Sequence, residues 1–300
     1  MRRKLLFFVN PISGGRSKAR LLENIAARCR KENAAFEILE TNKEGNYDFL
    51  PDKIKNEQVT DVIICGGDGS IRSIVSFLLA THVNVGIIPL GSGNGLARTA
   101  LIPYSIPKAL NTIFYGQAAF VDAFYVNGKL GCQITGLGFD AFIAAEFAKE
   151  RKRGLKTYTK LAIKHFFRTK PYDFTVEWGD EHLHLKAFIL CTSNANQFGN
   201  NMKIAPKALL NDGKLDVVVL KKTSKLNILV SFVNHLLFGQ KTPEGQIQKN
   251  AGNIAYFNVS KIKIINHQMA PVHIDGDPYP TEKEFIIEVL PNAFKLIQPL

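Results

Sequence analysis

The chain has 300 residues, of which 46% are hydrophobic and 21% charged, as expected for a folded protein with one large domain or two ordinary ones. No apolar run approaches the roughly 20 residues that a membrane-spanning helix needs, and the apolar stretch behind the basic N-terminus is short enough to predict a first strand instead of a signal peptide. The formal net charge of +12 favours anionic partners, namely nucleotide phosphates, an acidic membrane surface or nucleic acid. Because the sequence predicts neither a membrane span nor a signal peptide, we expect a cytoplasmic protein.

The first part of the chain alternates short β-rich runs with helical patterns. We expect strands at residues 4–9, 35–40, 61–65 and 85–90, and helices at 17–31, at 71–80 and from residue 96 onward. Alternation of this kind produces parallel strands that are covered by helices on both faces. Residues 1–122 are therefore predicted to form a three-layer α/β nucleotide-binding domain, with its ligand at the carboxyl ends of the strands.

Beyond residue 122, short strands separated by Asn-Gly and Asp-Gly turns dominate the pattern. We expect them at residues 120–126, 130–135, 174–178, 184–192, 215–220, 259–265 and 285–290. A basic helical stretch over residues 139–168 interrupts the series. Residues 123–300 are therefore predicted to form a β-sandwich domain, whose C-terminal segment can return to the first domain.

The four cysteines, Cys29, Cys65, Cys132 and Cys191, lack the spacing of a zinc site or of a disulfide framework. Two of them, Cys65 and Cys191, lie in apolar, strand-like runs. The sequence therefore predicts buried free thiols.

Two glycine-rich loops carry the strongest chemical signal. The first reads Gly66-Gly67-Asp68-Gly69-Ser70, and the second reads Gly91-Ser92-Gly93-Asn94-Gly95. Each follows an expected strand and precedes an expected helix. Glycine lets the backbone approach a ligand closely, and a following helix points free N–H groups at the same place. Two such loops at one edge of a sheet predict a phosphate-binding site.

Asp68 decides what kind of phosphate chemistry this site supports. A carboxylate in a phosphate loop repels the ligand unless Mg²⁺, which binds carboxylate and phosphate oxygens together, offsets its charge. Alternatively, Asp68 accepts a proton from an attacking hydroxyl as a general base. Both roles fit phosphoryl transfer. The structural alternative is a tight turn in which Asp68 caps its own helix.

Other nucleotide-binding signatures are missing from the sequence. It contains no Walker A motif, which excludes a P-loop protein, and no H-R-D or D-F-G motif, which excludes an ordinary protein kinase. No nucleic-acid-binding motif is present either, so nucleic acid is not an expected partner.

Three N-terminal motifs resemble those of the diacylglycerol kinase catalytic family, which includes bacterial lipid kinases and the sphingosine and ceramide kinases. They are the two glycine-rich loops and Asn10-Pro11-Ile12-Ser13-Gly14-Gly15. Further matches follow in the family's order, at residues 135–140 (Thr-Gly-Leu-Gly-Phe-Asp), 211–216 (Asn-Asp-Gly-Lys-Leu-Asp) and 275–277 (Asp-Gly-Asp). The resemblance thus extends from residue 5 to about residue 280.

The resemblance implies an ATP- and Mg²⁺-dependent kinase that phosphorylates a lipid hydroxyl. The residues that it places around ATP are Asn10, Pro11, Ser13, Gly14, Thr41, Gly66, Gly67, Asp68, Gly69, Ser70, Arg72, Gly91, Ser92, Gly93, Asn94 and Asp275. It implies Asp277 as the catalytic base, with Asp122 near the acceptor hydroxyl and Asp68 at the metal–phosphate centre. It also implies a structural Mg²⁺ site made by the Asp212 side chain and the carbonyls of Leu209 and Lys214.

One departure from the family's pattern bears directly on catalysis. The usual Glu of the Asp-Gly-Glu motif is Asp277 here. Aspartate is one methylene shorter, and about 1 Å of misplacement can cost substantial rate. Asp68 and Asp122 therefore remain alternative bases.

Residues 149–170 carry nine basic side chains against the single acidic Glu150. At helical spacing, Leu155, Tyr158, Ala162 and Phe166 fall on one face, with lysines around them. Such a helix can lie on an anionic bilayer, which would place the protein peripherally at the inner membrane face, or it can pack this face on the core.

Several functional alternatives stay open at this point. The acceptor lipid can be a sphingoid base, which the Gly91–Ala97 loop favours, or diacylglycerol or phosphatidylglycerol. An NAD kinase shares the Gly-Gly-Asp-Gly loop but lacks the N-terminal Asn-Pro motif and the Gly-Ser-Gly-Asn loop. A non-catalytic lipid-binding protein of the same fold is favoured only by Asp277. The oligomeric state is open too, a homodimer included.

Overall fold

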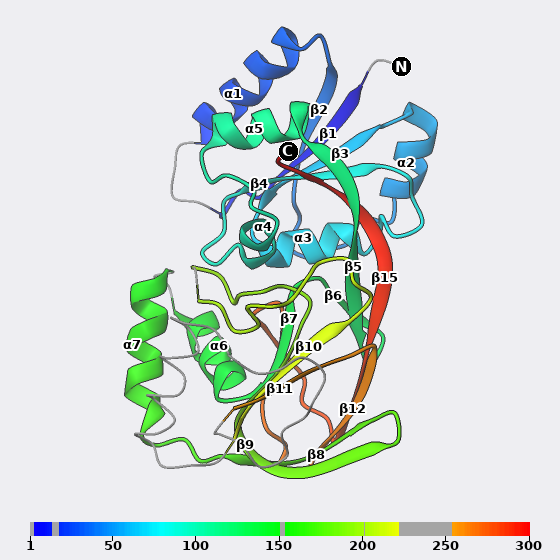
Figure 1. Cartoon of the computed structure of the whole chain (residues 1–300). Coiled ribbons are helices and arrows are strands. Elements are labelled where there is room, and N and C mark those ends of the chain that lie inside the picture. The colour runs from blue at the N-terminus through cyan, green and yellow to red at the C-terminus, as the bar shows by residue number, and fades with distance from the viewer. Residues whose placement is uncertain (1–2, 14–17, 151–153, 201, 222–253) are drawn as a thin grey trace. The chain divides into compact units, whose positions relative to one another are not determined.

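The computed structural model describes residues 3–13, 18–150, 154–200, 202–221 and 254–300 (Figure 1). Gly14 of the expected ATP loop and the basic residues 151–153 lie outside these described residues. The chain divides into two compact units. The first comprises Met1–Val121 and Asn292–Leu300, and the second comprises Asp122–Pro291. No helix among the described residues is long and apolar enough to cross a membrane.

The first unit is a parallel sheet with helices between its strands. Its strands are β1 (Lys4–Val9), β2 (Ala35–Glu40), β3 (Asp61–Gly66) and β4 (Asn84–Pro89), and its helices are α1 (Lys18–Lys31), α2 (Leu50–Glu57), α3 (Asp68–Val75), α4 (Gly95–Thr99) and α5 (Ile106–Tyr115). The strands lie in the order β2-β1-β3-β4, and every neighbouring pair is parallel. The last residues of the chain continue this sheet, because Lys295 and Leu296 pair in parallel with β4.

Both faces of this sheet are covered. Leu5, Phe7 and Val9, which alternate along β1, join a buried cluster with α1 and α5 on one face. Phe8 points the opposite way and packs edge-on against Tyr47, with 5.3 Å between the ring centroids. The inner strands β1, β3 and β4 are accordingly buried along most of their length, whereas the edge strand β2 is only half-buried.

The second unit is an antiparallel structure with two helices. Its elements are the end of β5 (Gln117–Val126), β6 (Lys129–Gly131), β7 (Ile134–Gly138), α6 (Phe139–Lys149), α7 (Leu155–Phe166), β8 (Tyr172–Trp178), β9 (Glu181–Ser193), β10 (Leu215–Lys221), β11 (Ile254–Val259), β12 (Lys261–Asn266), β13 (Val272–Ile274), β14 (Asp277–Tyr279) and the start of β15 (Glu284–Gln298). The strand order is β14-β13-β7-β9-β8-β12-β15, and β10 pairs with β9 and β11.

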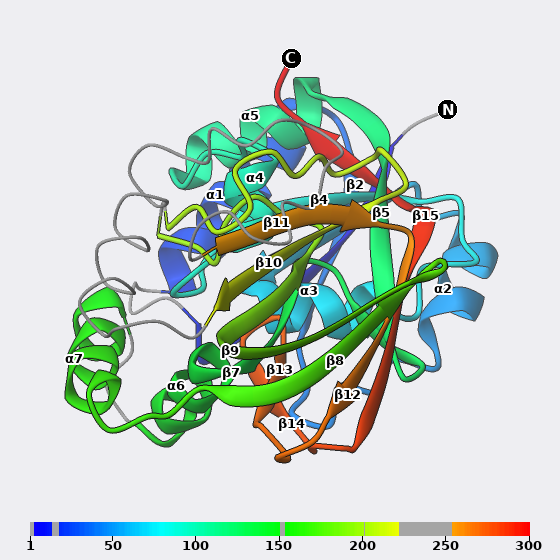
Figure 2. The same ribbon diagram turned by 60° about the horizontal axis from the view of Figure 1, so that its bottom comes forward.

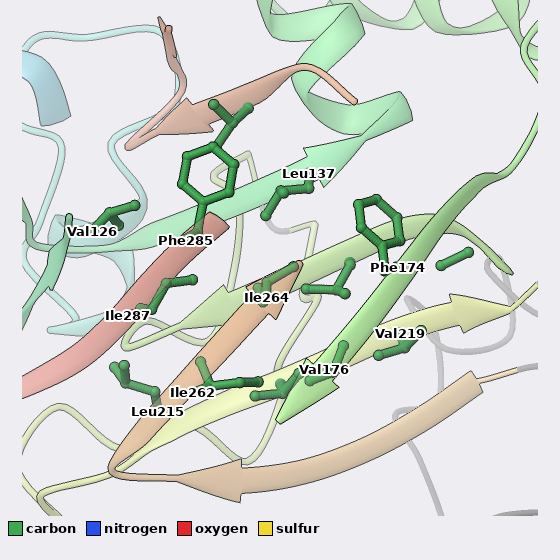
Figure 3. Packing of buried hydrophobic residues seen from close by; sticks show 14 of the residues in the cluster. Val126, Leu137, Phe174, Val176, Leu215, Val219, Ile262, Ile264, Phe285 and Ile287 are labelled. Atoms are coloured by element: carbon green, nitrogen blue, oxygen red, sulfur yellow. The ribbon is translucent and has the colours of Figure 1, made fainter. Parts of the chain in front are cut away.

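The core of the second unit lies between two groups of strands. Figure 3 shows Phe174 of β8, Ile264 of β12 and Phe285 of β15 pointing toward side chains of β7 and β10, such as Leu137 and Val219. All five are buried. This packing of side chains between facing strands is that of a β-sandwich.

Helices α6 and α7 cover the outer face of β7, β9 and β10 (Figure 2). Along β10, Val217 and Val219 enter the sandwich core, whereas Val218 and Leu220 pack with the helices. The four cysteines are buried free thiols, as predicted. Cys191 lies on the helix-covered face of β9.

Several element boundaries differ from the sequence-based expectation. The strand expected at 130–135 is two strands, β6 and β7. The one expected at 259–265 is mainly β12, and β11, which ends at Val259, was not predicted. The basic helical stretch is also two helices. The helix expected at 71–80 is α3, which ends at Val75. It begins earlier than expected because Asp68, Gly69 and Ser70 form its first turn, which is closed by a hydrogen bond from the Ile71 N–H to the Gly67 carbonyl.

Buried Asp216 on β10 gives the second unit a pH-dependent stability. Burial raises the pKa of this carboxyl from its ordinary 3.8 to about 6, and the nearby Tyr256 hydroxyl offsets the rise only in part. The folded state thus binds this proton more tightly than the unfolded state does. The resulting stabilisation is complete below pH 3.8, the ordinary pKa, and is lost as the pH rises through about 6.

We expect Asp216→Asn to be more stable than the wild type by about 1–2 kcal/mol at pH 7.5 and by much less at pH 4, since one pKa unit is worth about 1.4 kcal/mol. Urea unfolding at the two pH values measures this difference. The exposed Asp180→Asn is the matched control and should show no such dependence. An equal effect of Asp216→Asn at both pH values would contradict the assignment.

Candidate active site

Three loops leave the carboxyl ends of β1, β3 and β4, which are neighbours in the sheet. The Asn10 main-chain N–H donates to the Cys65 carbonyl, and the Leu90 N–H donates to the Gly66 carbonyl. The Asn10 side chain donates from Nδ2 to the Ser70 Oγ at 2.9 Å. The loops predicted to bind ATP are therefore brought together in the first unit.

The first of these loops is held in shape by its own side chains. Asn10 Oδ1 accepts hydrogen bonds from the N–H groups of Ile12 and Ser13, at 2.9 and 3.2 Å. Lys18, at the start of α1, donates from Nζ to the Ser13 carbonyl. Pro11 and Ile12 are exposed between these anchors. The described part of this loop, residues 10–13, is thus held by the side chains of Asn10 and Lys18.

The two glycine-rich loops touch at Gly67 and Gly91. A Cβ atom built on Gly91 would lie 2.5 Å from the Gly67 Cα, so only glycine fits there. Asn94, which is buried and has a positive φ of 50°, accepts from the Gly91 N–H through Oδ1 at 2.8 Å and donates to the Gly91 carbonyl at 2.7 Å. This pair of bonds holds the second loop in the shape that lets Gly91 approach Gly67.

We expect Gly91→Ala to push the two loops apart and weaken ATP binding about tenfold or more, since overpacking typically costs 1–3 kcal/mol and about 1.4 kcal/mol is a factor of ten in affinity. Calorimetric titration with MgATP measures the loss. Gly179→Ala is the control for general destabilisation, because its Cβ meets no atom within 4 Å but its φ of 52° strains an alanine in the β8–β9 hairpin, outside the glycine-rich loops. Equal ATP affinity in both variants would contradict the close contact.

Asp68 connects the second loop to α3. The N-cap of α3 is Gly67, so Asp68 is the first helical residue and does not cap its own helix. Its Oδ2 accepts from the Gly95 N–H at 3.1 Å, and its Oδ1 accepts from the Leu96 N–H at 3.3 Å. The carboxylate therefore lies where both loops begin their helices. A nucleotide-bound Mg²⁺ needs one or two protein carboxylates besides phosphates and water, which this arrangement can supply.

The remaining ATP candidates of the first unit, and Arg98 beside them, lie next to these loops. Thr41 follows β2, and its N–H donates to the Val9 carbonyl at 3.1 Å. Arg72 lies one turn into α3, and Ser92 is exposed in the second loop. Arg98 stacks on Tyr104, 4.3 Å from its ring centroid, and donates from Nε to the Gly93 carbonyl at 3.3 Å.

Asp122 is brought together with the loop predicted to hold a structural Mg²⁺. Its Oδ2 accepts from the Gly213 N–H at 2.8 Å, and its own N–H donates to the Leu210 carbonyl at 2.6 Å. Asp122 is buried, with 2% of its surface exposed, whereas Leu209, Asp212 and Lys214 are exposed. Asp212 Oδ1 accepts from the Lys214 N–H at 3.0 Å.

Asp275 organises the backbone around the Asp-Gly-Asp motif. Its carboxylate accepts three main-chain hydrogen bonds, from Cys132 at 2.9 Å, Gln133 at 2.8 Å and Ile134 at 3.0 Å. These N–H groups are taken from the strand ladder, which is why the expected strand at 130–135 is interrupted. Asp277 follows as the first, exposed residue of β14.

Comparison with known proteins decides the family. Residues 4–126 match the family model of the diacylglycerol kinase catalytic domain, and residues 133–298 match that of the YegS C-terminal NAD kinase β-sandwich-like domain. The chain belongs to the diacylglycerol kinase family. The predicted fold class, an α/β domain followed by a β-sandwich, is confirmed.

Bacterial relatives show the same extent of similarity. A "probable lipid kinase YegS-like" of Shewanella frigidimarina is 28% identical over 81% of this chain and 78% of its own length. A protein of the same name from Citrobacter koseri is 28% identical over 90% of this chain and 88% of its own length. The crystal structure of a diacylglycerol kinase from Bacillus anthracis shares the fold, with a TM-score of 0.71 at 20% identity over 99% of this chain and 97% of that one.

Sequence reasoning missed the residues that connect the second unit's motifs in this family member. Asn194 donates from Nδ2 to the Asp122 carbonyl at 2.7 Å, and its N–H donates to the Gln133 carbonyl at 2.9 Å. Gln133 in turn donates its side-chain amide to the Gln197 carbonyl at 3.0 Å. These residues lie far apart in the sequence, and only the neighbouring motif residues 135–140 marked their region.

Proposed function

We propose that this member of the diacylglycerol kinase family is an ATP- and Mg²⁺-dependent lipid kinase that transfers the γ-phosphate to a lipid hydroxyl. One observation carries the proposal: the loops after β1, β3 and β4 lie together, and the Asp68 carboxylate lies where the glycine-rich loops meet. Amides and hydroxyls at such loops bind phosphate, and a carboxylate at the same place suits a bridging metal ion.

In this proposal the first unit holds the nucleotide. N–H groups of the loops and the hydroxyls of Ser70 and Ser92 would bind the phosphates, with Asn10 linking the first loop to Ser70 and Asn94 holding the second loop in shape. Asp68 would hold the Mg²⁺, whose contribution is to neutralise charge on the phosphates.

Asp277 is the base that the structure supports best among the three candidates. Asp122 is buried and its carboxylate accepts the Gly213 N–H, and Asp68 accepts two amides within the first unit. Asp277 is exposed at the start of β14, where it can meet a hydroxyl of an incoming lipid. It would take the proton from that hydroxyl as the oxygen attacks the γ-phosphorus.

The loop around Asp212 would bind a second, structural Mg²⁺ in the same proposal. Its ligands would be the exposed Asp212 carboxylate and the carbonyls of Leu209 and Lys214, which are the hard oxygen donors that Mg²⁺ prefers. The hydrogen bond from the Gly213 N–H to the buried Asp122 carboxylate holds this loop in place. Mg²⁺ should raise the melting temperature of the wild type more than that of Asp212→Asn, and equal rises would contradict this site.

Transfer of label from γ-labelled ATP tests the function and the acceptor together. Mixed micelles would carry diacylglycerol, ceramide, a sphingoid base and phosphatidylglycerol, and NAD would be offered separately as acceptor. We expect label in one lipid, dependent on Mg²⁺ and absent with Asp68→Ala. Label in NAD alone would replace the lipid kinase by an NAD kinase. ATP binding without transfer to any acceptor would favour a non-catalytic lipid-binding protein.

Peripheral contact with an anionic membrane is part of the proposed function, but the structure changes the face that would make it. Of the two placements that the sequence left open for the face with Leu155, Tyr158, Ala162 and Phe166, the structure has the second for three residues, because Tyr158, Ala162 and Phe166 pack on the core. The outward face of α7 instead exposes Ile163 by 65% and Phe167 by 70%. Leu155 is also exposed, beside the exposed basic residues Lys156, Lys160, Lys164 and Arg168.

Binding to vesicles tests this face. Apolar residues among basic ones favour an anionic bilayer, each cation contributing about 1 kcal/mol near the surface. We expect co-sedimentation with vesicles that contain phosphatidylglycerol, little with phosphatidylcholine alone, and a severalfold loss in the double variant Ile163→Ser/Phe167→Ser. Unchanged binding of the double variant would exclude α7 as the contact.

A further inference from the structure

A cluster of buried residues lies next to the turn that carries Asp277 and contacts it through His273. Cys191 of β9, Gly136 of β7 and His273 of β13 are paired with one another across three neighbouring strands. Asp140, from the first turn of α6, lies over Gly136. Its Oδ2 is 3.2 Å from His273 Nε2 and accepts from Cys191 Sγ at 3.1 Å. His273 and Asp140 are 3% and 4% exposed.

Gly136 is what makes this arrangement possible. A Cβ atom at this position would lie 1.8 Å from Asp140 Oδ2 and 2.8 Å from His273 Nε2. No other residue leaves room for the carboxylate and the imidazole to meet. Gly136 and Asp140, the first glycine and the aspartate of the Thr-Gly-Leu-Gly-Phe-Asp motif, are thus both needed for the contact with His273.

The hydrogen bonds of His273 specify where its proton lies. The Gly276 N–H, which can only donate, points to His273 Nδ1 at 3.2 Å, so Nδ1 must be the acceptor. The proton of the neutral ring is therefore on Nε2, from which it is donated to Asp140. A hydrogen bond at one imidazole nitrogen commonly fixes the role of the other.

Gly276 lies at the centre of the turn that leads to Asp277. Asp275 and Gly276 have φ values of 52° and 84°, and Ile274 pairs with Asp277, as in a two-residue hairpin of type I′. The turn is anchored on one side by the Asp275 carboxylate on β6–β7 and on the other by His273. The Asp277 side chain starts one residue beyond the Gly276–His273 bond.

We propose that His273, held by Asp140 with its proton on Nε2, is a positioning residue that sets the Asp275–Gly276–Asp277 turn and so aims the Asp277 carboxylate at the acceptor hydroxyl. This rests on the proposed function, in which Asp277 is the base. Aspartate is shorter than the glutamate usual at this position, so its reach depends more on the turn. A displacement of about 1 Å can lower a rate by about 10²-fold.

Two substitutions of His273 separate this role from ordinary packing. The Oδ1 of His273→Asn can take the place of Nδ1 and accept the Gly276 N–H, but the side chain does not reach Asp140. His273→Gln reaches Asp140 but places no acceptor at the Nδ1 position. We expect His273→Gln to lower kcat by about 10–100-fold with KM for ATP unchanged, and His273→Asn to stay within about threefold of the wild type.

Activity is compared with two readouts that do not depend on catalysis. Amide hydrogen exchange in peptides spanning residues 272–279 should quicken in His273→Gln and not in His273→Asn. In the wild type with ¹⁵N-labelled histidine, nuclear magnetic resonance should find a residue-273 ring that is unprotonated at Nδ1 and protonated at Nε2. This second measurement judges the proposal even if a variant does not fold.

Each outcome has a definite meaning. Equal losses in both variants, a more active Gln than Asn variant, or a protonated Nδ1 in the wild type would overturn the positioning role. His273→Gln in an Asp277→Asn background should lower kcat no further, and an additional loss would contradict action through Asp277. If the wild type transfers no phosphate at all, the proposed function fails while the exchange and resonance results still decide the His273–Gly276 contact.

Discussion

Asp68→Ala is expected to lower kcat for phosphoryl transfer by at least about 10³-fold, because one side chain would lose two roles. Its carboxylate accepts the Gly95 and Leu96 N–H groups, which attach the second glycine-rich loop to the start of α3. In the proposed function it also holds the Mg²⁺ that neutralises the phosphates. We therefore expect weaker ATP binding together with the loss of rate, measured by calorimetry and by label transfer.

Asp68→Asn separates these two roles. The amide oxygen can still accept one of the two N–H groups, whereas the negative charge that Mg²⁺ requires is gone. We expect this variant to bind ATP within about tenfold of the wild type and to remain slow by about 10²–10³-fold. Recovery of kcat in Asp68→Asn would mean that Asp68 acts only through its hydrogen bonds to α4, and the proposed metal role would be withdrawn.

Asp277→Asn is expected to lower kcat by about 10²–10⁴-fold while ATP affinity stays the same, because a general base contributes about that much and Asp277 lies outside the nucleotide loops. Label transfer under saturating MgATP measures the effect. Asp277→Glu restores the residue usual in the family and is the matched control. We expect it to be at least as active as the wild type.

Asp68 and Asp122 are the alternative bases against which this prediction is tested. If Asp277→Asn keeps more than about a third of the wild-type rate, proton removal by Asp277 is excluded, since a lost general base costs far more. Asp122→Asn would then be the next variant. Its expected defect under the present proposal is instead a lower melting temperature, because the buried Asp122 carboxylate accepts the N–H of Gly213 and so holds the 209–214 loop.

Much of the fold could be predicted from the sequence because its determinants are local. The strand β2 has the bounds that its pattern predicted, Ala35–Glu40, and β1 does as well. The errors have non-local causes. The break between β6 and β7 arises because a carboxylate more than 140 residues away, Asp275, takes their N–H groups. The strand expected at 285–290 continues as β15 to Gln298, because its last residues pair with β4.

The candidate site likewise has parts with local determinants, which the sequence predicted, and parts with non-local ones, which it did not. The glycine-rich loops could be recognised from their residues and their places between strands and helices, whereas Asn10 was found through the resemblance to the kinase family. What the sequence could not give are the contacts between loops, such as Gly67 against Gly91 and Asn10 to Ser70. His273 was not among the predicted site residues, since nothing near it in the sequence indicates contact with a carboxylate 133 positions earlier in the chain.

Amide hydrogen exchange with and without MgATP tests most directly whether the loops of the first unit bind the nucleotide. We predict protection in peptides that cover residues 66–72 and 91–98, and none in the β8–β9 hairpin at residues 172–186. Asp68→Ala should remove the protection. Protection confined to the second unit, or none at a MgATP concentration that saturates phosphoryl transfer, would contradict the proposed nucleotide site.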